Sequence, residues 1–339
     1  MTTGPHSSDD TRPRLLYIAP ESQLQPYYAD LQAAVGDRLV LALYDFAAAP
    51  QPQFDGIDVV VEHGGGYASR EMVDAGARAG VRLWQVTATG TDHIDLEHFR
   101  GAGIPVAHMP GPRSTAIPMA EHVLLLMLAH AKRLLPSQES LHAGIVNAPM
   151  TAELCGKTVA IVGLGASGRE LATRCKAMGM VVMAVDQVDV PSAERDRLGL
   201  SFFGGPEQLD RLLAEADYVS LHLPLTPGTR GILGRRELGL MKRTAVLVNV
   251  ARGALVDEEA LVDALERGGI GGAGLDVFVE EPVDPAHPLL RLPNVIATPH
   301  NGVVSRELSL RRAALAVENV ERVTSGLPPL FALEGGPEA

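Results

Sequence analysis

The feature that most constrains this chain is a glycine pattern placed directly after an apolar run. Residues 158–163 read TVAIVG and continue as LGASGR, which sets Gly163, Gly165 and Gly168 in a G-x-G-x-x-G spacing. The first glycine permits a tight turn, the second lets a pyrophosphate approach the backbone, and the third lets a helix pack closely on a strand. The pattern predicts a dinucleotide-binding strand, turn and helix. The predicted cofactor contacts here are Gly163, Gly165, Ala166, Ser167, Gly168 and Arg169.

The residue that ends the next apolar run indicates which dinucleotide is bound. Residues 180–185 read MVVMAV and are followed by Asp186. A carboxylate at this position accepts hydrogen bonds from ribose hydroxyls and repels a 2′-phosphate. The following residues, QVDVP, offer no Arg or Lys to hold such a phosphate. We therefore predict NAD rather than NADP. The alternative is that Asp186 is a solvated strand-end acid and that the glycines serve packing alone.

Short β-branched runs alternate with helical patterns along the chain. The runs are mostly apolar on both faces, as expected for strands of parallel sheets that helices cover. We predict an α/β protein with two Rossmann-like or flavodoxin-like parallel-sheet domains, the cofactor domain inserted in the substrate domain. The expected substrate (catalytic) domain is 1–110 with 303–339, and the expected NAD-binding domain is 111–302. Expected strands are 14–19, 39–44, 57–61, 82–86, 104–108, 158–163, 180–185, 217–223, 244–250, 272–278 and 294–298.

Two further segments carry the expected helices that link the domains. The apolar pattern after Pro118 predicts a long helix that Pro136 ends, followed by a connector over residues 137–157. The periodic segment 305–324 predicts a last helix. No strand follows it in the second sheet, so we expect it to fold back on the first domain.

Composition and charge exclude several classes of function. The 339 residues carry 29 Lys and Arg against 41 Asp and Glu, a formal net charge of −12, which disfavours nucleic-acid binding. No apolar run approaches the roughly 20 residues of a membrane span, and the polar start MTTGPHSSDDTRPR lacks a signal-peptide core. Cys155 and Cys175 have neither disulfide-scaffold nor metal-site spacing. We expect a cytoplasmic protein without a metal.

Polar residues follow three expected strands in the second half of the chain. The segments are NVARGALVD (249–257), GLDVFVEEP (274–282) and ATPHNG (297–302). Rossmann-type sheets bind ligands at the carboxyl ends of their strands, so these segments should converge near the nicotinamide. The candidate residues are Arg252, Asp276, Glu281 and His300.

The combination of motifs resembles the D-isomer-specific 2-hydroxyacid dehydrogenase family. The resemblance rests on GLGASGR, LHLPLTPGTRGI, LVNVARGALVD, GAGLDVFVEEP and TPHNG, with weaker matches at TGTDHID and PMAEHVLLLMLA. It covers roughly residues 15–326. It implies an NAD-dependent enzyme that interconverts a small 2-keto acid and its D-2-hydroxy acid, similar to a glyoxylate or hydroxypyruvate reductase. It also implies a homodimer.

The resemblance assigns roles to individual residues. Arg252 would hold the substrate carboxylate and polarise the keto oxygen, His300 would be the acid/base, and Glu281 would hydrogen-bond His300. Asp276 would lie at the nicotinamide carboxamide. The implied catalytic residues are thus Arg252, Glu281 and His300. Further implied cofactor contacts are His222, Pro224, Thr229, Val250, Asp276 and Gly302, and implied substrate contacts are His63, Gly64 and Gly65 together with Arg252.

Other functions stay open from the sequence. A D-3-phosphoglycerate dehydrogenase would need a cation near the substrate phosphate, but residues 60–69 contain no Lys or Arg. A binding protein that senses NAD(H), similar to transcriptional corepressors, would need no turnover. A methyltransferase is disfavoured by the third glycine and by the later motifs. His63 could also be a loop-tip histidine without a role, and His108 stands where the family often has asparagine.

Overall fold

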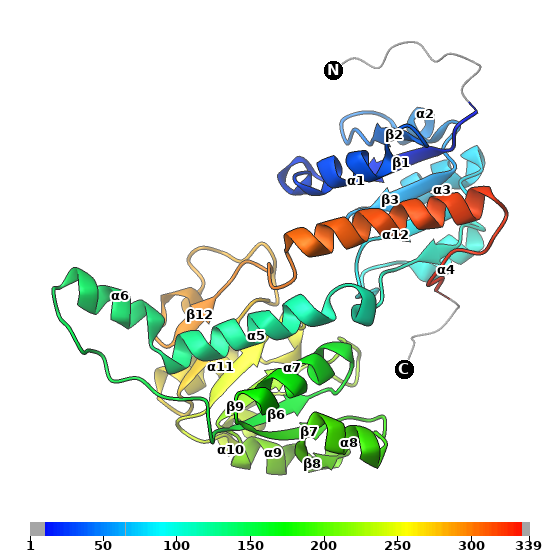
Figure 1. The fold of residues 1–339 in the computed structure, drawn as a ribbon. Coiled ribbons are helices and arrows are strands. Elements are labelled where there is room, and N and C mark those ends of the chain that lie inside the picture. Colours follow the sequence, from blue (N-terminus) through cyan, green and yellow to red (C-terminus); the bar gives the residue numbers. More distant parts are fainter. Residues whose placement is uncertain (1–10, 65, 334–339) are drawn as a thin grey trace. The chain divides into compact units, whose positions relative to one another are not determined.

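The computed structural model describes residues 11–64 and 66–333 and shows two compact α/β units (Figure 1). The first unit contains the chain up to Ser114 and from Ser305 onward, and the second unit contains Thr115–Val304. The sequence placed these divisions slightly earlier, at 110/111 and 302/303. Among the described residues, no helix has the length and apolar content needed to cross a bilayer.

The first unit is built on a parallel sheet with the strand order β2-β1-β3-β4-β5. Alternate residues of its strands face opposite sides: Leu15 and Tyr17 pack under α1 and α12, whereas Leu16 and Ile18 pack with the residues of α2, α3 and α4. The strands are β1 (Arg14–Ile18), β2 (Val40–Leu43), β3 (Val59–Glu62), β4 (Leu83–Val86) and β5 (Val106–Ala107). The helices are α1 (Tyr27–Val35), α2 (Pro50–Phe54), α3 (Arg70–Ala79), α4 (Leu96–Gly101) and α12 (Arg306–Thr324).

The order of this sheet reverses between β1 and β3. From β1 the chain moves to the edge strand β2, and it then returns to the other side of β1 with β3, β4 and β5. Parallel sheets of this kind bind ligands outside the carboxyl ends of the strands at such a reversal. The long helix α12 covers this region of the sheet beside α1, which confirms the expectation that the last helix folds back on the first domain.

The second unit contains a larger parallel sheet with the order β12-β11-β10-β9-β6-β7-β8. Helices α5 and α7 cover one face, and α9, α10 and α11 cover the other. Its strands are β6 (Thr158–Val162), β7 (Val181–Val185), β8 (Leu200–Gly204), β9 (Tyr218–Leu221), β10 (Val246–Asn249), β11 (Gly272–Leu275) and β12 (Val295–Ala297). Its helices are α5 (Ala116–Ala131), α6 (Leu134–His142), α7 (Ala166–Ala177), α8 (Ser192–Leu198), α9 (Leu209–Glu215), α10 (Arg235–Leu240) and α11 (Glu258–Glu266).

The structure corrects the sequence prediction at the helix that was expected to end at Pro136. Helix α5 ends at Ala131, because Arg133 adopts a left-handed backbone conformation with φ 48°. A second helix, α6, then begins at Leu134, within residues predicted partly as a connector. Pro136 is tolerated there because the N–H groups of a first helical turn have no intrahelical partner.

The structure also contains one strand that the sequence prediction missed. Strand β8 lies at the edge of the second sheet and pairs only with β7. Its side chains are half-buried or exposed rather than buried, so the run LSFFG lacks the apolar pattern by which the other strands were recognised. The predicted fold class is otherwise confirmed by the two parallel sheets.

Candidate active site

In the glycine turn after β6, one glycine has room for a side chain and two do not. A Cβ atom on Gly163 would lie 2.7 Å from the carbonyl oxygen of His222, and one on Gly168 would lie 2.3 Å from the carbonyl oxygen of Gly163. A Cβ atom on Gly165 would meet nothing within 4 Å. Gly163 and Gly168 are therefore required for packing, whereas Gly165 leaves an open approach to the backbone.

This open approach leads to the start of α7. Gly165 is its N-cap and makes no side-chain cap hydrogen bond, so the helix presents backbone N–H groups at this end. Ala166 and Ser167 form its first residues, and the guanidinium Nε of Arg169 lies 3.2 Å from Glu194 Oε1. The backbone N–H donors and the positive end of the helix dipole at this terminus are suited to bind a pyrophosphate. The residues present therefore fit the dinucleotide predicted from the glycine spacing.

Asp186 has a role in the turn that the sequence did not reveal. Its Oδ2 accepts a hydrogen bond from the N–H of Leu164 at 2.5 Å, and its Oδ1 accepts one from the N–H of Val188 at 2.9 Å. The carboxylate thus fixes the glycine turn to the end of β7. A carboxylate has about four acceptor positions, so this arrangement leaves capacity for ribose hydroxyls.

The loop after β9 contains the predicted residues His222, Pro224 and Thr229. The ring of His222 hydrogen-bonds Ser167 Oγ through Nδ1 and Ser220 Oγ through Nε2, both at 2.9 Å. Burial lowers the pKa of His222 to about 4, so the ring is neutral near pH 7. Thr229 Oγ1 donates to the carbonyl of Pro224 at 2.7 Å and closes the loop. His222 therefore ties this loop to the start of α7.

The loop after β10 positions Arg252. The side chain of Asn249 is buried; its Nδ2 donates to the Arg252 carbonyl at 2.9 Å, and its Oδ1 accepts from the Ala251 N–H at 3.1 Å. The side chain of Val250 is buried in the core, so only its backbone is available to a cofactor. A Cβ atom on Gly253 would lie 2.0 Å from the backbone carbon of Phe278. Gly253 is thus required for the close approach of this loop to the segment that carries Glu281.

Glu281 and His300, two of the three predicted catalytic residues, form a direct side-chain pair. His300 Nδ1 lies 2.7 Å from Glu281 Oε2, and Glu281 Oε1 accepts from the Phe278 N–H at 2.9 Å. The hydrogen bond to Glu281 raises the pKa of His300, against the partial burial of its half-exposed ring and the charge of Arg252. Burial opposes ionisation of Glu281, but the hydrogen bonds from His300 and Phe278 lower its pKa, and Arg252 adds to this.

The backbone of His300 is held in the left-handed region, at φ 52°. Such conformations cost about 1–3 kcal/mol in a non-glycine residue and persist only where surrounding contacts impose them. Here the His300 N–H donates to the Asp276 carbonyl at 2.9 Å and to the Thr298 carbonyl at 3.1 Å. The strand ends β11 and β12 therefore fix the direction in which the imidazole leaves the chain.

Asp276 is fully buried, and its carboxylate organises the loop that carries His300. Oδ1 accepts from Thr298 Oγ1 at 2.5 Å and from the Asn301 N–H at 3.0 Å, and Oδ2 accepts from the Gly302 N–H at 2.8 Å. Burial opposes the charge of this carboxylate, but the hydrogen bonds from His122 and Thr298 lower its pKa. These contacts are with the protein; the predicted contact with the nicotinamide carboxamide stays a prediction.

The predicted substrate contacts of the first unit lie at the end of β3. The side chain of His63 is buried, and its Nδ1 hydrogen-bonds the hydroxyl of Tyr17 at 2.8 Å, so the alternative of a loop-tip histidine is wrong. The N–H of Gly64 donates to Thr87 Oγ1 at 3.1 Å. Gly65 lies outside the described residues. The predicted contacts of these residues with a substrate stay predictions.

Several residues that shape the site were missed by the sequence reasoning. His122 of α5 contacts Asp276 and hydrogen-bonds Thr298 Oγ1 at 2.9 Å. Glu62 at the end of β3 accepts from Trp84 Nε1 at 2.7 Å and from the Tyr67 N–H at 2.7 Å, and so anchors the loop after His63. The histidine in PMAEHVLLLMLA was visible as a polar residue in an apolar helix, but nothing in the sequence indicated its partner.

The chain is similar in sequence and fold to several known proteins. The profile of the D-isomer specific 2-hydroxyacid dehydrogenase, NAD binding domain, matches residues 124–302. The glyoxylate reductase of Aeropyrum pernix is 39% identical over 258 residues, which are 74% of this chain and 75% of that protein. The crystal structure of a Thermus thermophilus protein superposes with a TM-score of 0.79 at 35% identity, covering 95% of this chain and 100% of that one.

Other relatives are longer than this chain. The D-3-phosphoglycerate dehydrogenase of Methanocaldococcus jannaschii is 36% identical over 271 residues, which are 79% of this chain but 50% of that protein. The match to the D-3-phosphoglycerate dehydrogenase of Archaeoglobus fulgidus covers 44% of that protein. The chain thus spans about half the length of these two relatives.

Proposed function

The chain belongs to the D-isomer specific 2-hydroxyacid dehydrogenase family, and we propose that it is an NAD-dependent oxidoreductase that interconverts a small 2-keto acid and its D-2-hydroxy acid. The observation that carries the proposal is the 2.7 Å hydrogen bond between His300 Nδ1 and Glu281 Oε2. A histidine paired with a carboxylate at the carboxyl ends of Rossmann strands has the properties of a general acid/base. The glycine turn and Asp186 are the residues that would hold NAD.

When bound, NADH supplies a hydride to the keto carbon, and the chain's own residues handle the charge and the proton. His300 has Nδ1 bound to Glu281, so we assign proton transfer to Nε2 on the other side of the ring. In the reduction, Nε2–H breaks and its proton joins the keto oxygen, which holds the electron pair released from the C=O π bond. Glu281 stays ionised and stabilises the imidazolium before the proton leaves. Arg252 is suited to bind the substrate carboxylate bidentately.

The first experiment measures NADH oxidation with a panel of 2-keto acids. Relatives carry the names glyoxylate reductase and D-3-phosphoglycerate dehydrogenase, so the panel contains glyoxylate, hydroxypyruvate, pyruvate and 3-phosphohydroxypyruvate. We expect turnover of at least one of these, and a loss of about 10²–10⁴-fold in kcat in the His300→Ala variant. Tight NADH binding without any absorbance change would instead support the NAD(H)-sensing binding protein that the sequence left open.

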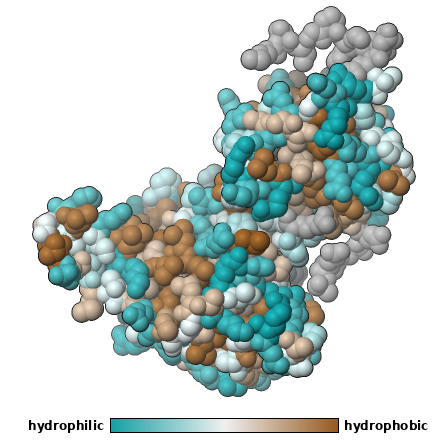
Figure 2. Space-filling view, in the orientation of Figure 1, coloured by the Kyte–Doolittle hydropathy of each residue, from teal (hydrophilic) through white to brown (hydrophobic). Residues whose placement is uncertain are grey.

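We also propose that the protein forms a homodimer. We propose the cytoplasm as its location. Large apolar side chains are exposed over α6 and the segment after it, among them Leu141 at 73%, Val146 at 79% and Met150 at 88% (Figure 2). Large apolar side chains gathered on one exposed segment are typical of a protein interface. We expect sedimentation at the mass of two chains, and dissociation in a Leu141→Asp, Val146→Asp double variant. A monomeric wild type would contradict the dimer.

A further inference from the structure

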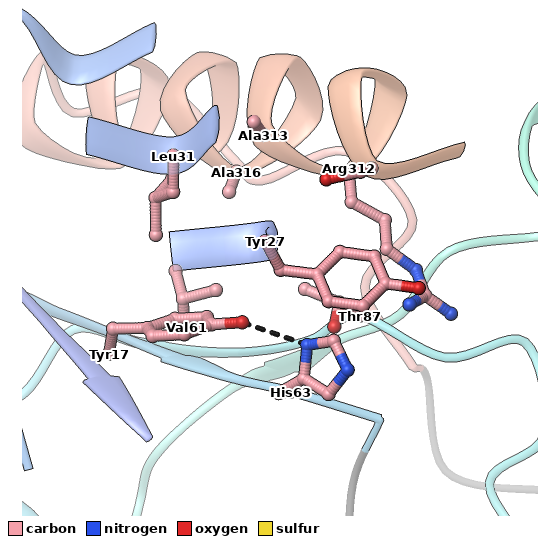
Figure 3. A pocket seen from close by; sticks show the side chains of 10 residues that line it. Tyr17, Tyr27, Leu31, Val61, His63, Thr87, Arg312, Ala313 and Ala316 are labelled. Carbon is pink, nitrogen blue, oxygen red and sulfur yellow. Dashed lines mark hydrogen bonds between the residues drawn. The ribbon is translucent and has the colours of Figure 1, made fainter. Parts of the chain in front are cut away.

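A small cavity lies at the order reversal of the first unit's sheet, lined by apolar side chains of the sheet and helices together with several polar ones (Figure 3). Tyr17 reaches it from β1 and His63 from the end of β3, the two strands between which the order reverses. Tyr27 of α1 and Arg312 of α12 cover it from above the sheet. The space within it is about 10 Å³, room for one water-sized atom. The place is the one where sheets of this order bind ligands.

Arg312 brings a positive charge to this cavity, and its nearest polar neighbours are tyrosines rather than acids. Its guanidinium carbon lies 5.3 Å from the centre of the Tyr27 ring, and burial lowers its pKa while the tyrosines raise it. None of the described residues that line the cavity is acidic. The carboxylate of Asp30, on the same pair of helices, is already bound by Arg306 and Ser309. A buried cation without a partner is unfavourable, and an anion that joins it removes much of that cost.

Two polar atoms at the cavity make no well-aligned hydrogen bond with the described residues, although a hydrogen bond between their own two side chains is the smallest of the causes that raise the pKa of Arg312. They are Nε of Arg312 and the hydroxyl oxygen of Tyr27, both buried from solvent. Figure 3 shows the hydroxyl end of Tyr27 beside the guanidinium of Arg312, with the ring of His63 below the Tyr27 ring. A guanidinium N–H can only donate, and a phenol can donate as well. Arg312 therefore offers donors here, and the Tyr27 hydroxyl, which can accept from the guanidinium, keeps its own O–H to donate to a ligand.

His63 does not supply the missing negative charge. Its Nδ1 is occupied by the Tyr17 hydroxyl at 2.8 Å, and its ring packs against Tyr27 with centres 4.3 Å apart. Burial, with the charge of Arg312 as the smaller cause, lowers the pKa of His63 to about 3. The ring is therefore neutral near pH 7, and the cavity keeps one net positive charge.

We propose that this cavity is an anion site, in which Arg312 and the Tyr27 hydroxyl bind one oxygen of a carboxylate or phosphate group on a small acid. The sequence provides no cation in residues 60–69 for such a group, and α12 supplies it from the other end of the chain. The anion is either a group of the enzyme's substrate or a separate small acid. Only the first of these assignments rests on the proposed function.

The test of the site is direct binding to the full chain. We expect calorimetry to detect binding of malonate or inorganic phosphate to the wild type. Arg312→Met keeps the apolar stem and removes the charge, so it should weaken binding about 10–100-fold, the usual range for a hydrogen bond to a charged group. Tyr27→Phe should weaken binding less, because it removes a neutral donor. Arg312→Lys keeps the charge and should recover part of the affinity, even if Arg312→Met is poorly folded.

Arg322→Met is the matched control. Arg322 lies on the same helix, donates to the Pro328 carbonyl at 2.9 Å and does not line the cavity. Its variant should bind both anions as the wild type does. The proposal is overturned if the wild type binds neither anion, or if a folded Arg312→Met variant binds them with wild-type affinity.

Kinetics then identify the source of the anion. If a second acidic group of the substrate supplies it, Arg312→Met lowers kcat/KM for oxaloacetate or 3-phosphohydroxypyruvate more than for glyoxylate, whose single carboxylate is assigned to Arg252. If a separate acid supplies it, free malonate or phosphate changes the rate with glyoxylate in the wild type and not in Arg312→Met. Should no 2-keto acid be turned over, the proposed function fails, and the calorimetry still decides whether the anion site exists.

Discussion

Replacing Glu281 by Gln removes a charge from the site while nearly preserving the shape of the side chain. The carboxylate of Glu281 accepts a hydrogen bond from His300 and raises its pKa, so replacing that carboxylate by a neutral amide lowers the pKa of His300. Reduction of a 2-keto acid needs the protonated imidazole and fades as pH rises through this pKa. In Glu281→Gln, the pH at which the rate of reduction falls should therefore be lower than in the wild type. The pH at which the rate of oxidation rises should be lower by the same amount.

The size of the effect follows from the exposure of the pair. A hydrogen bond to a charged group contributes about 1.5–3 kcal/mol in protein interiors. The side chains of His300 and Glu281 are 46% and 35% exposed, and solvent screening reduces the contribution to about 1–1.5 kcal/mol. This corresponds to a roughly five- to tenfold lower rate on the falling limb. The assay is kcat/KM for NADH-dependent reduction, measured across the pH range in wild type and variant.

The neighbouring acid provides the control. Glu280 is exposed and lies one residue before Glu281, so Glu280→Gln makes the same chemical change outside the hydrogen bond to His300. We expect the Glu280→Gln profile to coincide with that of the wild type. A Glu281→Gln enzyme with full activity and an unmoved limb would refute the reasoning and remove Glu281 from the mechanism.

The remaining predictions concern the cofactor turn and the buried carboxylate. Gly168→Ala places a methyl group 2.3 Å from the Gly163 carbonyl and should lower the free energy of unfolding by about 1–3 kcal/mol in denaturant titrations. Gly165→Ala meets no atom within 4 Å, so it should unfold as the wild type does and lose NADH affinity in a fluorescence titration. Asp186→Ser should narrow the preference for NADH over NADPH, read from the ratio of the two kcat/KM values. Asp276→Asn should lose about 1–3 kcal/mol of stability. Since the pKa of Asp276 is lowered, that loss should be present above the ordinary carboxyl pKa and vanish as pH falls through the lowered one.

The sequence predicted those parts of the fold that depend on neighbours in the chain. Buried parallel strands are apolar on both faces, so runs such as residues 158–162 and 246–249 could be recognised without their partners. Arg252, Glu281 and His300 each follow a strand of one sheet, and the carboxyl ends of parallel strands meet at one edge. The pairing of Glu281 with His300 could therefore be predicted, and the structure confirms their contact.

Contacts between distant helices and strands could not be predicted in the same way. His122 and Thr298 are hydrogen-bonded across 176 residues of sequence, and no spacing rule relates a helix position to a strand end at that separation. The approach of Arg312 to His63 is of the same kind, because it depends on how α12 lies across the sheet. The break between α5 and α6 depends on one backbone conformation, at Arg133, a residue type that does not ordinarily mark a turn.

The geometry of the proposed acid/base pair depends on residues that perform no chemistry themselves. His300 is exposed and has an unfavourable left-handed backbone, so its side chain would have no fixed direction without support from beneath. Asp276 provides that support through its own carbonyl and through the N–H groups of Asn301 and Gly302. The carboxylate can stay ionised in a buried position only because His122 and Thr298 also bind it. Reactive groups are held in place by rigid surrounding residues. Here those residues come from α5 and from the ends of β11 and β12, and together they fix the position of the His300 imidazole. The strain at His300 is thus offset by buried hydrogen bonds, which explains why an acid/base residue can be both exposed and well oriented.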